Sequence, residues 1–263
     1  MSIFIIHLSA SMRLHTFQGY IQNIHLVEYE HGCLLLDGCC SLDLPIISDY
    51  FSHALKRPIS DLKVVVVTHM HPDHAGCALK LKTVSNCIIV SGEFSKQWYS
   101  GIKGHIAHIV DMTLALWVAG RLGKKRKNLW YPRFLSPDRQ LADNARLPFF
   151  EDWTVIRTPG HTDRDISLVN NKEKMIYVAD LIVSVKKRFA APFPIYLPNE
   201  YKHSLHRLLQ YTGYDMLMAH VPKKPIERAT IEQLIKNAPN SPQTNVTAIY
   251  KKIRRFKQRT MQN

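Results

Sequence analysis

The sequence predicts an α/β fold, and three observations support that prediction. Short apolar segments alternate along the chain with segments that have helical spacing. Leu62–Thr68 contains four consecutive valines, which is typical of a strand buried on both faces of a sheet. Hydrophobic residues make up 46% of the 263 residues, an ordinary globular composition that excludes an intrinsically disordered chain.

The first half of the chain is expected to alternate strands with helices. Ser2–Ala10 is apolar but short and lacks a positively charged start, so a first strand is expected there rather than a signal peptide. Further strands are predicted at Gly32–Leu36, Leu62–Thr68 and Cys87–Val90, and helices at Leu44–Lys56 and Ala75–Val84.

The middle of the chain departs from this alternation. Ile106–Leu122 has helical length and is apolar nearly all round, so it must be buried in the protein or against another surface. Core packing or a homodimer interface is the favoured expectation, and contact with a membrane is the alternative. A basic run follows this helix directly. We therefore interpret residues 94–149 as a helical basic insert.

The second half returns to strands and helices. Strands are predicted at Trp153–Arg157, Ile166–Val169, Met175–Ala179 and Met216–Ala219, and helices at Glu200–Tyr211 and Ile226–Lys236. Residues 1–240 are expected to form one domain. The linker-like Pro239–Pro242 leads into a basic C-terminal tail, 241–263, with helical character from Val246.

Two short segments hold most of the net charge of +14. Arg121–Arg139 has seven cations against one acid, and the tail from Lys251 has six cations and no acid, so each contributes +6. Such patches suggest an anionic partner, either a membrane surface or nucleic acid. A solvated charged face without a partner is the usual alternative.

The five cysteines match no disulfide framework or zinc ribbon, because their number is odd and their spacing irregular. We interpret them as reduced thiols of a cytoplasmic protein. No uncharged apolar run is long enough to span a bilayer, so any membrane association would be peripheral.

Four metal-binding side chains follow the valine strand within six residues: His69, His71, Asp73 and His74. They lie at the carboxyl end of that strand, where α/β sheets open their functional crevice. Imidazole and carboxylate groups are good ligands for zinc and similar ions. With this spacing, one turn divides the four groups more easily between two ions than it wraps them around one.

The pattern His69-x-His71-x-Asp73-His74 resembles the signature of the metallo-β-lactamase superfamily. Three later motifs match that family in order: Thr158–Thr162, Ile176–Asp180 and Leu217–His220. The resemblance implies that His69, His71 and His161 bind one metal, that Asp73, His74 and His220 bind a second, and that Asp180 bridges them. The implied cofactors are two Zn²⁺ ions, with iron or manganese as alternatives.

The resemblance covers about Gly19 to Pro222. It implies an αββα sandwich, in which two mixed β-sheets are flanked by helices. The chain has Asp37-Gly38-Cys39 where the family often has Asp-Thr-Gly. The resemblance implies that Asp37 holds the metal loop and does not itself bind metal.

The implied activity is hydrolysis of a carboxyl derivative by a metal-bridging hydroxide. Thioesters, as in glyoxalase II-like enzymes, and lactones are the expected substrates, and an acyl-bearing small molecule would suit the apolar helix. Asp73 is the candidate catalytic residue, because it can orient the nucleophile and pass a proton. Tyr196 or Tyr201 is a candidate donor to an oxyanion, with core packing as the alternative.

Two other functions stay open. A phosphodiesterase acting on nucleic acid or phospholipid would use the same metals and the basic tail. A membrane-surface binding protein with a vestigial site would use only the basic and apolar surfaces, and the complete ligand set argues against it.

Overall fold

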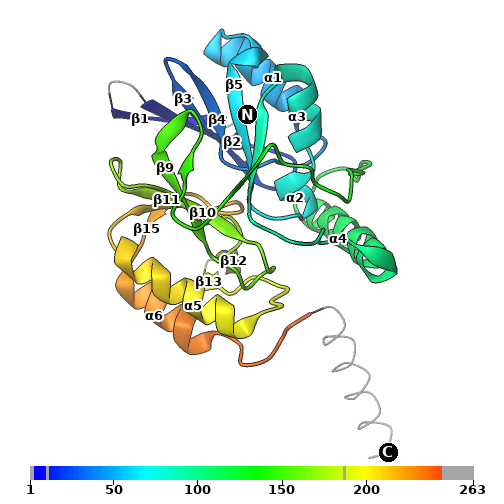
Figure 1. The fold of residues 1–263 in the computed structure, drawn as a ribbon, viewed down its shortest axis with the longest axis vertical. Helices are drawn as coiled ribbons and strands as arrows, with labels where there is room; N and C mark the ends of the chain where they lie inside the picture. Colours follow the sequence, from blue (N-terminus) through cyan, green and yellow to red (C-terminus); the bar gives the residue numbers. More distant parts are fainter. Residues whose placement is uncertain (1–2, 10–11, 186–187, 245–263) are drawn as a thin grey trace, which may run out of the picture.

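Two β-sheets pack face to face in the structure, a computed structural model that describes residues 3–9, 12–185 and 188–244 (Figure 1). Helices cover the outer face of each sheet. The chain thus has the α/β sandwich of two mixed sheets that the sequence and the resemblance predict. The predicted helical tail from Val246 lies outside the described residues.

The first sheet has seven strands in the order of the sequence. Its first four strands pair antiparallel, and the pairs from β4 to β7 are parallel. The strands are β1 (Ile3–Ser9), β2 (Met12–Gln18), β3 (Asn23–Tyr29), β4 (Gly32–Leu35), β5 (Leu62–Val67), β6 (Ile88–Gly92) and β7 (Arg139–Leu141).

The second sheet has six strands, in the order β15-β14-β11-β10-β9-β8. Only β11 and β14 pair parallel. The strands are β8 (Arg146–Leu147), β9 (Phe150–Arg157), β10 (Ile166–Asn170), β11 (Met175–Tyr177), β14 (Asp215–Leu217) and β15 (Lys224–Pro225), and a separate hairpin joins β12 (Val183–Val185) to β13 (Arg188–Ala190).

The valines of β5 show how the layers form. Val64 and Val66 point into the core between the sheets, where Trp153 of β9 is also buried. Val65 and Val67 point to the opposite face and pack in the core under the outer helices. Alternate side chains of a strand point to opposite faces, so four consecutive valines belong in a strand with a core on each side.

Helices close both outer faces (Figure 1). The first sheet is covered by α1 (Leu44–Asp49), which continues as a π-helix over Tyr50–Leu55, and by α3 (Ala78–Ser85). A 3₁₀ turn, Ile59–Asp61, leads into β5. The second sheet is covered by α5 (Pro198–Leu208), extended by a 3₁₀ turn at Leu209–Tyr211, and by α6 (Arg228–Asn237).

The segment 94–149, expected to be a helical basic insert, contains one long helix, α4 (Gly101–Arg121). This helix begins five residues before the predicted Ile106. Its inner side packs on the protein, but Ile106 and Trp117 are exposed, so the chain itself does not bury the apolar helix on all sides. The segment also contains β7 and β8, which extend the two sheets.

The five cysteines are free and buried. Among the helices of the described residues, none combines the length and apolar character that a membrane span requires.

Candidate metal centre

The predicted ligand segment forms a tight turn between β5 and the short helix α2 (Pro72–Ala75). Pro72 occupies the start of α2, where its fixed φ suits the first helical turn. The turn lies against Gly38, whose absent side chain is essential because a Cβ there would be 2.5 Å from the His74 carbonyl oxygen. Close packing of these two backbone segments therefore fixes the position of the turn.

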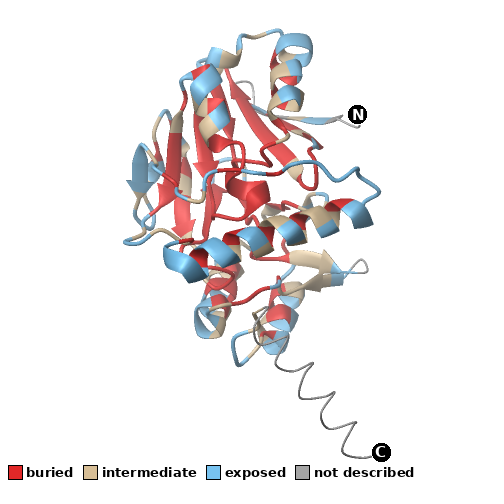
Figure 2. Cartoon of the chain, turned by 90° about the vertical axis from the view of Figure 1, so that its right-hand side faces the viewer, coloured by how far each residue is buried: buried red, intermediate tan, exposed pale blue. Residues whose placement is uncertain are grey.

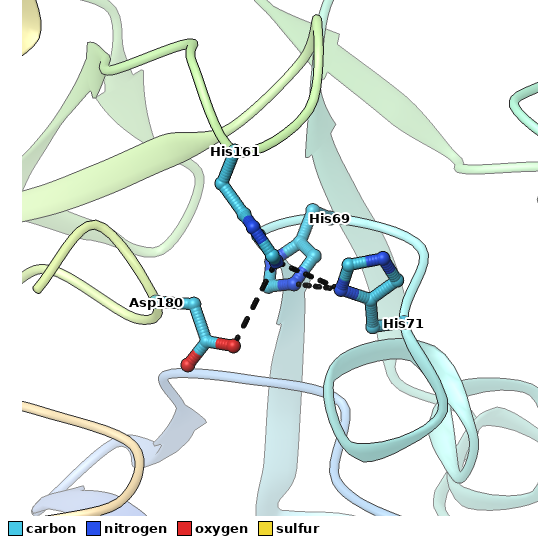
Figure 3. Close-up of side chains that lie close together, drawn as sticks. All are labelled: His69, His71, His161 and Asp180. Atoms are coloured by element: carbon cyan, nitrogen blue, oxygen red, sulfur yellow. Dashed lines mark hydrogen bonds and ion pairs between the residues drawn. The ribbon is translucent and has the colours of Figure 1, made fainter. Parts of the chain in front are cut away.

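Three imidazoles converge in a first group with Asp180 (Figure 3). His71 Nδ1 lies 3.1 Å from His69 Nε2 and 2.9 Å from His161 Nε2. His161 comes from the Pro-Gly-His turn after β9, so the group joins the edges of both sheets. The ligand atoms of the four residues lie within 4.8 Å of one another.

A second group contains Asp73, His74 and His220, again with ligand atoms within 4.8 Å of one another. His220 follows β14, and its Nε2 lies 3.2 Å from Asp73 Oδ2. His74 Nε2 lies 3.5 Å from the same oxygen.

Asp180 stands between the two groups. Its Oδ2 lies 3.8 Å from His161 Nε2 in the first group. Its Oδ1 lies 3.3 Å from His220 Nε2 and 3.5 Å from His74 Nε2 in the second. Asp180 follows Ala179, whose φ of 46° turns the chain out of the strand direction at the end of the β11 segment. One carboxylate therefore presents an oxygen to each group.

Neighbouring acceptors fix the tautomers of these histidines. His161 Nδ1 donates to the Pro194 carbonyl at 2.6 Å, and His220 Nδ1 donates to the Ile21 carbonyl at 3.2 Å. His74 Nδ1 donates to Asp37 Oδ2 at 2.6 Å. In each ring the acceptor holds the Nδ1 proton, so Nε2 is the nitrogen that faces the site and that would bind a metal once it carries no proton of its own.

Asp37 is buried and does not belong to either group. Its Oδ2 also accepts hydrogen bonds from Thr68 Oγ1 at 2.8 Å and from Tyr177 OH at 2.9 Å. Because Thr68 donates to Asp37, its oxygen accepts from His69 Nδ1 at 3.1 Å. Asp37 thus orients His74 directly and His69 through Thr68, the holding role that the resemblance implies.

The electrostatics differ between the groups. Burial and the neighbouring imidazoles lower the pKa of His69 well below its usual value, and burial lowers that of His71 to about 3. Burial alone would also lower the pKa of His220, but Asp180 and Asp73 raise it to about 10. His69 and His71 of the first group therefore offer neutral nitrogens, whereas His220 of the second shares with carboxylates a proton that a metal ion would displace.

One further observation indicates that these residues are suited to bind metal ions. His74 Nε2 and Asp180 Oδ1 are buried without a hydrogen-bond partner. Buried polar atoms are rarely left unpaired, and two such atoms facing each other across 3.5 Å are suited to share a cation.

Asp111 of α4 belongs to the site but was not among the predicted residues. Its Oδ2 lies 3.7 Å from His71 Nε2 and accepts a hydrogen bond from Tyr99 OH at 2.9 Å. Burial raises the pKa of Asp111 to about 6. The available signal was its position as the only acid within the apolar helix.

A pocket of about 300 Å³ opens over both groups. Asp73, Asp111 and Asp180 are among the residues that line it. Its walls are largely apolar and come from α4, from β12 and from the loop before α5, with Leu114, Val118, Val185 and Phe193 among them. This size and composition are usual for a small-molecule site.

The two candidate oxyanion donors lie outside this pocket lining. Tyr201 is a fully buried residue of α5, and its hydroxyl donates to the Leu181 carbonyl at 3.2 Å, so the core-packing alternative holds for it. Tyr196 packs its ring edge-on against Trp98.

All seven predicted ligands thus lie together in the two expected groups, and their binding of metal stays a prediction. A family model described as the metallo-beta-lactamase superfamily matches residues 18–234. The chain is 21% identical over 188 residues to "Probable metallo-hydrolase YflN" of Bacillus subtilis (strain 168), which covers 68% of this chain and 67% of that protein.

Two solved structures have the same fold. A metallo-beta-lactamase family protein of Thermus thermophilus, TTHA1429, matches with a TM-score of 0.62 and 18% identity, covering 88% of this chain and 80% of that one. TTHA1623 in a di-iron-bound form matches with a TM-score of 0.54 and 20% identity, covering 83% and 96%. From the extent of the family match, the chain belongs to the metallo-beta-lactamase superfamily.

Proposed function

We propose that the protein is a binuclear metal-dependent hydrolase, with two zinc ions as its cofactors. The observation that carries the proposal is Asp180, which presents one oxygen to each ligand group. One ion would be held by His69, His71 and His161, and the other by Asp73, His74 and His220. When bound, such ions would polarise a substrate carbonyl and make water a nucleophile at neutral pH. Iron is the alternative metal, because TTHA1623 binds two iron ions.

The protein's own residues supply orientation and proton transfer. Asp73 lines the pocket. Burial alone would raise its pKa, but His74 and His220 outweigh burial and lower it. Asp73 is therefore a carboxylate at neutral pH and can orient water and accept a proton. With a substrate in the pocket, the apolar walls would reduce the access of bulk water to the reacting groups, which would strengthen the electrostatic interactions inside.

The pocket favours a carboxyl derivative, such as a thioester or a lactone, over a phosphodiester. Among the described residues that line it there is no lysine or arginine, whereas three are aspartates. The proposed ions would neutralise Asp73 and Asp180, but a phosphodiester would still meet the carboxylate of Asp111 and no cationic side chain among the described lining residues. An uncharged ester group with an apolar acyl chain suits the walls around Leu114 and Phe193.

Elemental analysis of protein purified without chelator, paired with hydrolysis assays on thioesters, lactones and phosphodiesters, tests the proposal. We expect about two equivalents of metal and chelator-sensitive turnover of a thioester or a lactone. His71→Ala and Asp180→Asn should abolish turnover, whereas His53→Ala, at an exposed histidine outside the site, should not change it. Absence of bound metal after incubation with zinc, iron or manganese would overturn the proposal. Turnover of phosphodiesters alone would show that the substrate is a phosphodiester and not a carboxyl derivative.

A further inference from the structure

One side of α4 is exposed to solvent (Figure 2), and several of the residues exposed there are large and apolar. Ile102, Ile106, Ile109 and Trp117 recur there with helical spacing, and their exposed fractions are 82%, 56%, 45% and 52%. Trp130, in the segment that follows the helix, is 56% exposed. A soluble monomer rarely gathers large apolar side chains in this way without a partner.

The same segment is strongly cationic. Residues 101–137 contain seven lysines and arginines, namely Lys103, Arg121, Lys124, Lys125, Arg126, Lys127 and Arg133. The only acid in these residues is Asp111, which is buried on the inner side of α4 against His71. The α4 surface, defined here as the exposed residues of 101–134, is therefore apolar and cationic without a counter-charge of its own.

The α4 surface adjoins the pocket. Leu114, Ala115 and Val118 on another side of the same helix line the pocket wall. Val185 and Phe193, which also line it, are about half exposed. A partner seated on the α4 surface would thus meet the mouth of the site.

We propose that the α4 surface docks on an anionic lipid bilayer. An amphipathic helix lies in the bilayer interface when its apolar side chains reach the acyl boundary and its cations contact phosphate groups. Trp117 and Trp130 would lie at the headgroup level, where tryptophan side chains gather. This docking goes beyond the proposed hydrolase activity and needs neither metal nor turnover.

The positive charge of the α4 surface argues against a second copy of the chain as its partner. In a twofold interface the same surface faces itself, so its six exposed cations would oppose six more with no acid between them. The exposed apolar side chains of the α4 surface argue against nucleic acid as its partner. Phosphates and bases are bound by cations and stacking aromatic rings, and three exposed isoleucines have no partner there.

Flotation of the full-length chain with vesicles tests the proposal. We expect the protein to float with vesicles of equal parts phosphatidylglycerol and phosphatidylcholine and to remain behind with phosphatidylcholine alone. High salt should weaken binding to the anionic vesicles, because it screens the lysines. The emission of Trp117 and Trp130 should shift to shorter wavelength on binding.

Two pairs of variants separate the contributions. Ile106→Ser with Trp117→Ser, and Lys124→Gln with Lys125→Gln, should each lower the partition coefficient at least about tenfold. The matched controls are Val84→Ser with Phe149→Ser, at exposed apolar residues elsewhere, and Lys172→Gln with Lys236→Gln, at exposed lysines elsewhere. We expect both controls to bind like the wild type.

Several outcomes would overturn the proposal. Equal binding of neutral and anionic vesicles would show that anionic lipid is not the partner, and binding to neither would remove the lipid partner altogether. If the α4 variants bind vesicles as the wild type does, another part of the chain makes the membrane contact. Light scattering that shows a dimer dissociated by the α4 variants, or RNA binding lost in the same variants, gives the surface a different occupant. None of these readouts depends on hydrolysis, so they are independent of the proposed function.

Discussion

Each histidine of the site has two ring nitrogens with different tasks. In His74, His161 and His220 an acceptor holds the Nδ1 proton, and Nε2 faces the ligand group. His71 is reversed, because its Nδ1 faces His69 and His161 while its Nε2 faces Asp111. The orientation of His71 therefore depends on α4, an element from outside the ligand turns.

Asp111→Asn tests this dependence. The carboxylate attracts the Nε2 proton of His71 and so makes Nδ1 a stronger ligand, and asparagine keeps the shape but removes the charge. We expect the affinity for zinc to fall about tenfold, measured by competition with a chromophoric chelator, with an unchanged fold by circular dichroism. Asp49→Asn, at an exposed carboxylate away from the site, is the control. Equal zinc affinities of Asp111→Asn and the wild type would contradict this role.

At the scale of elements, short contacts between the sheets hold the ligand turns in place. Asn23 of β3 donates its backbone N–H to the Ala219 carbonyl at 2.6 Å, next to His220. His25 of the same strand donates from Nε2 to the Met218 carbonyl at 3.0 Å and accepts from Thr16 Oγ1 through Nδ1. β3 of the first sheet thus positions the turn that carries His220.

His25 makes this contact sensitive to pH. Burial lowers its pKa from 6.5 to about 4, so the folded protein keeps it neutral while the unfolded chain binds a proton below pH 6.5. Stability should therefore fall as the pH drops from 6.5 towards 4, by about 3 kcal/mol in full. In urea titrations at pH 7.5 and 4.5, His25→Gln should lose less stability between the two values than the wild type. If His25→Gln lost as much stability between these pH values as the wild type, His25 would not contribute to the pH dependence. His53→Gln is the control and should behave like the wild type.

The Pro-Gly-His turn offers a second test at this scale. Gly160 has φ 147°, and a Cβ there would lie 2.5 Å from both Cα and Cβ of Tyr201 in α5. Gly160→Ala should force α5 away from the turn and cost about 3 kcal/mol of unfolding free energy, measured with urea. Gly213→Ala is the matched control, since its φ is 87° but its Cβ would meet open space, so we expect about 1 kcal/mol. Equal losses would mean that the contact with Tyr201 is unimportant.

Some elements could be predicted from the sequence because local pattern and tertiary role agree. The valines of β5 are buried on both faces, as their run indicates. The strands β2 and β3 were not predicted, because buried polar residues interrupt their apolar pattern. His15 and Glu28, for example, pair at 2.9 Å inside the protein, a contact that depends on the strand pairing itself.

Dependence on tertiary packing also explains why the exposed side of α4 and the role of Asp111 could not be predicted from the sequence. An apolar helix predicts burial, but only the packing of the whole chain shows which side is covered and that Ile106 is left exposed. Asp111 carries no motif, and its relation to His71 arises from residues 40 positions apart in the sequence. The ligand motifs were predictable because each occupies a strand end, where the two sheets necessarily bring them together.

At the scale of the whole molecule, the two ligand groups join the halves of the chain. His69, His71, Asp73 and His74 follow β5 of the first sheet, whereas His161, Asp180 and His220 follow strand segments of the second. A metal that binds only the folded protein stabilises it, by about 4 kcal/mol at a thousandfold excess over its dissociation constant.

Removal of metal should therefore loosen the contact between the sheets. In differential scanning calorimetry, a chelator should lower the melting temperature of the metal-loaded protein by about 10 °C. His161→Ala and His220→Ala each leave Asp180 as the only ligand that the second sheet gives to one group, so the chelator should shift their melting temperatures less. His53→Ala keeps both groups and should show the full shift. The chelator could instead leave the wild-type melting temperature unchanged in protein shown to contain metal. That result would mean that the ions do not hold the two sheets together. The hydrogen bonds from β3 to the Met218 and Ala219 carbonyls would then be the main link at this edge.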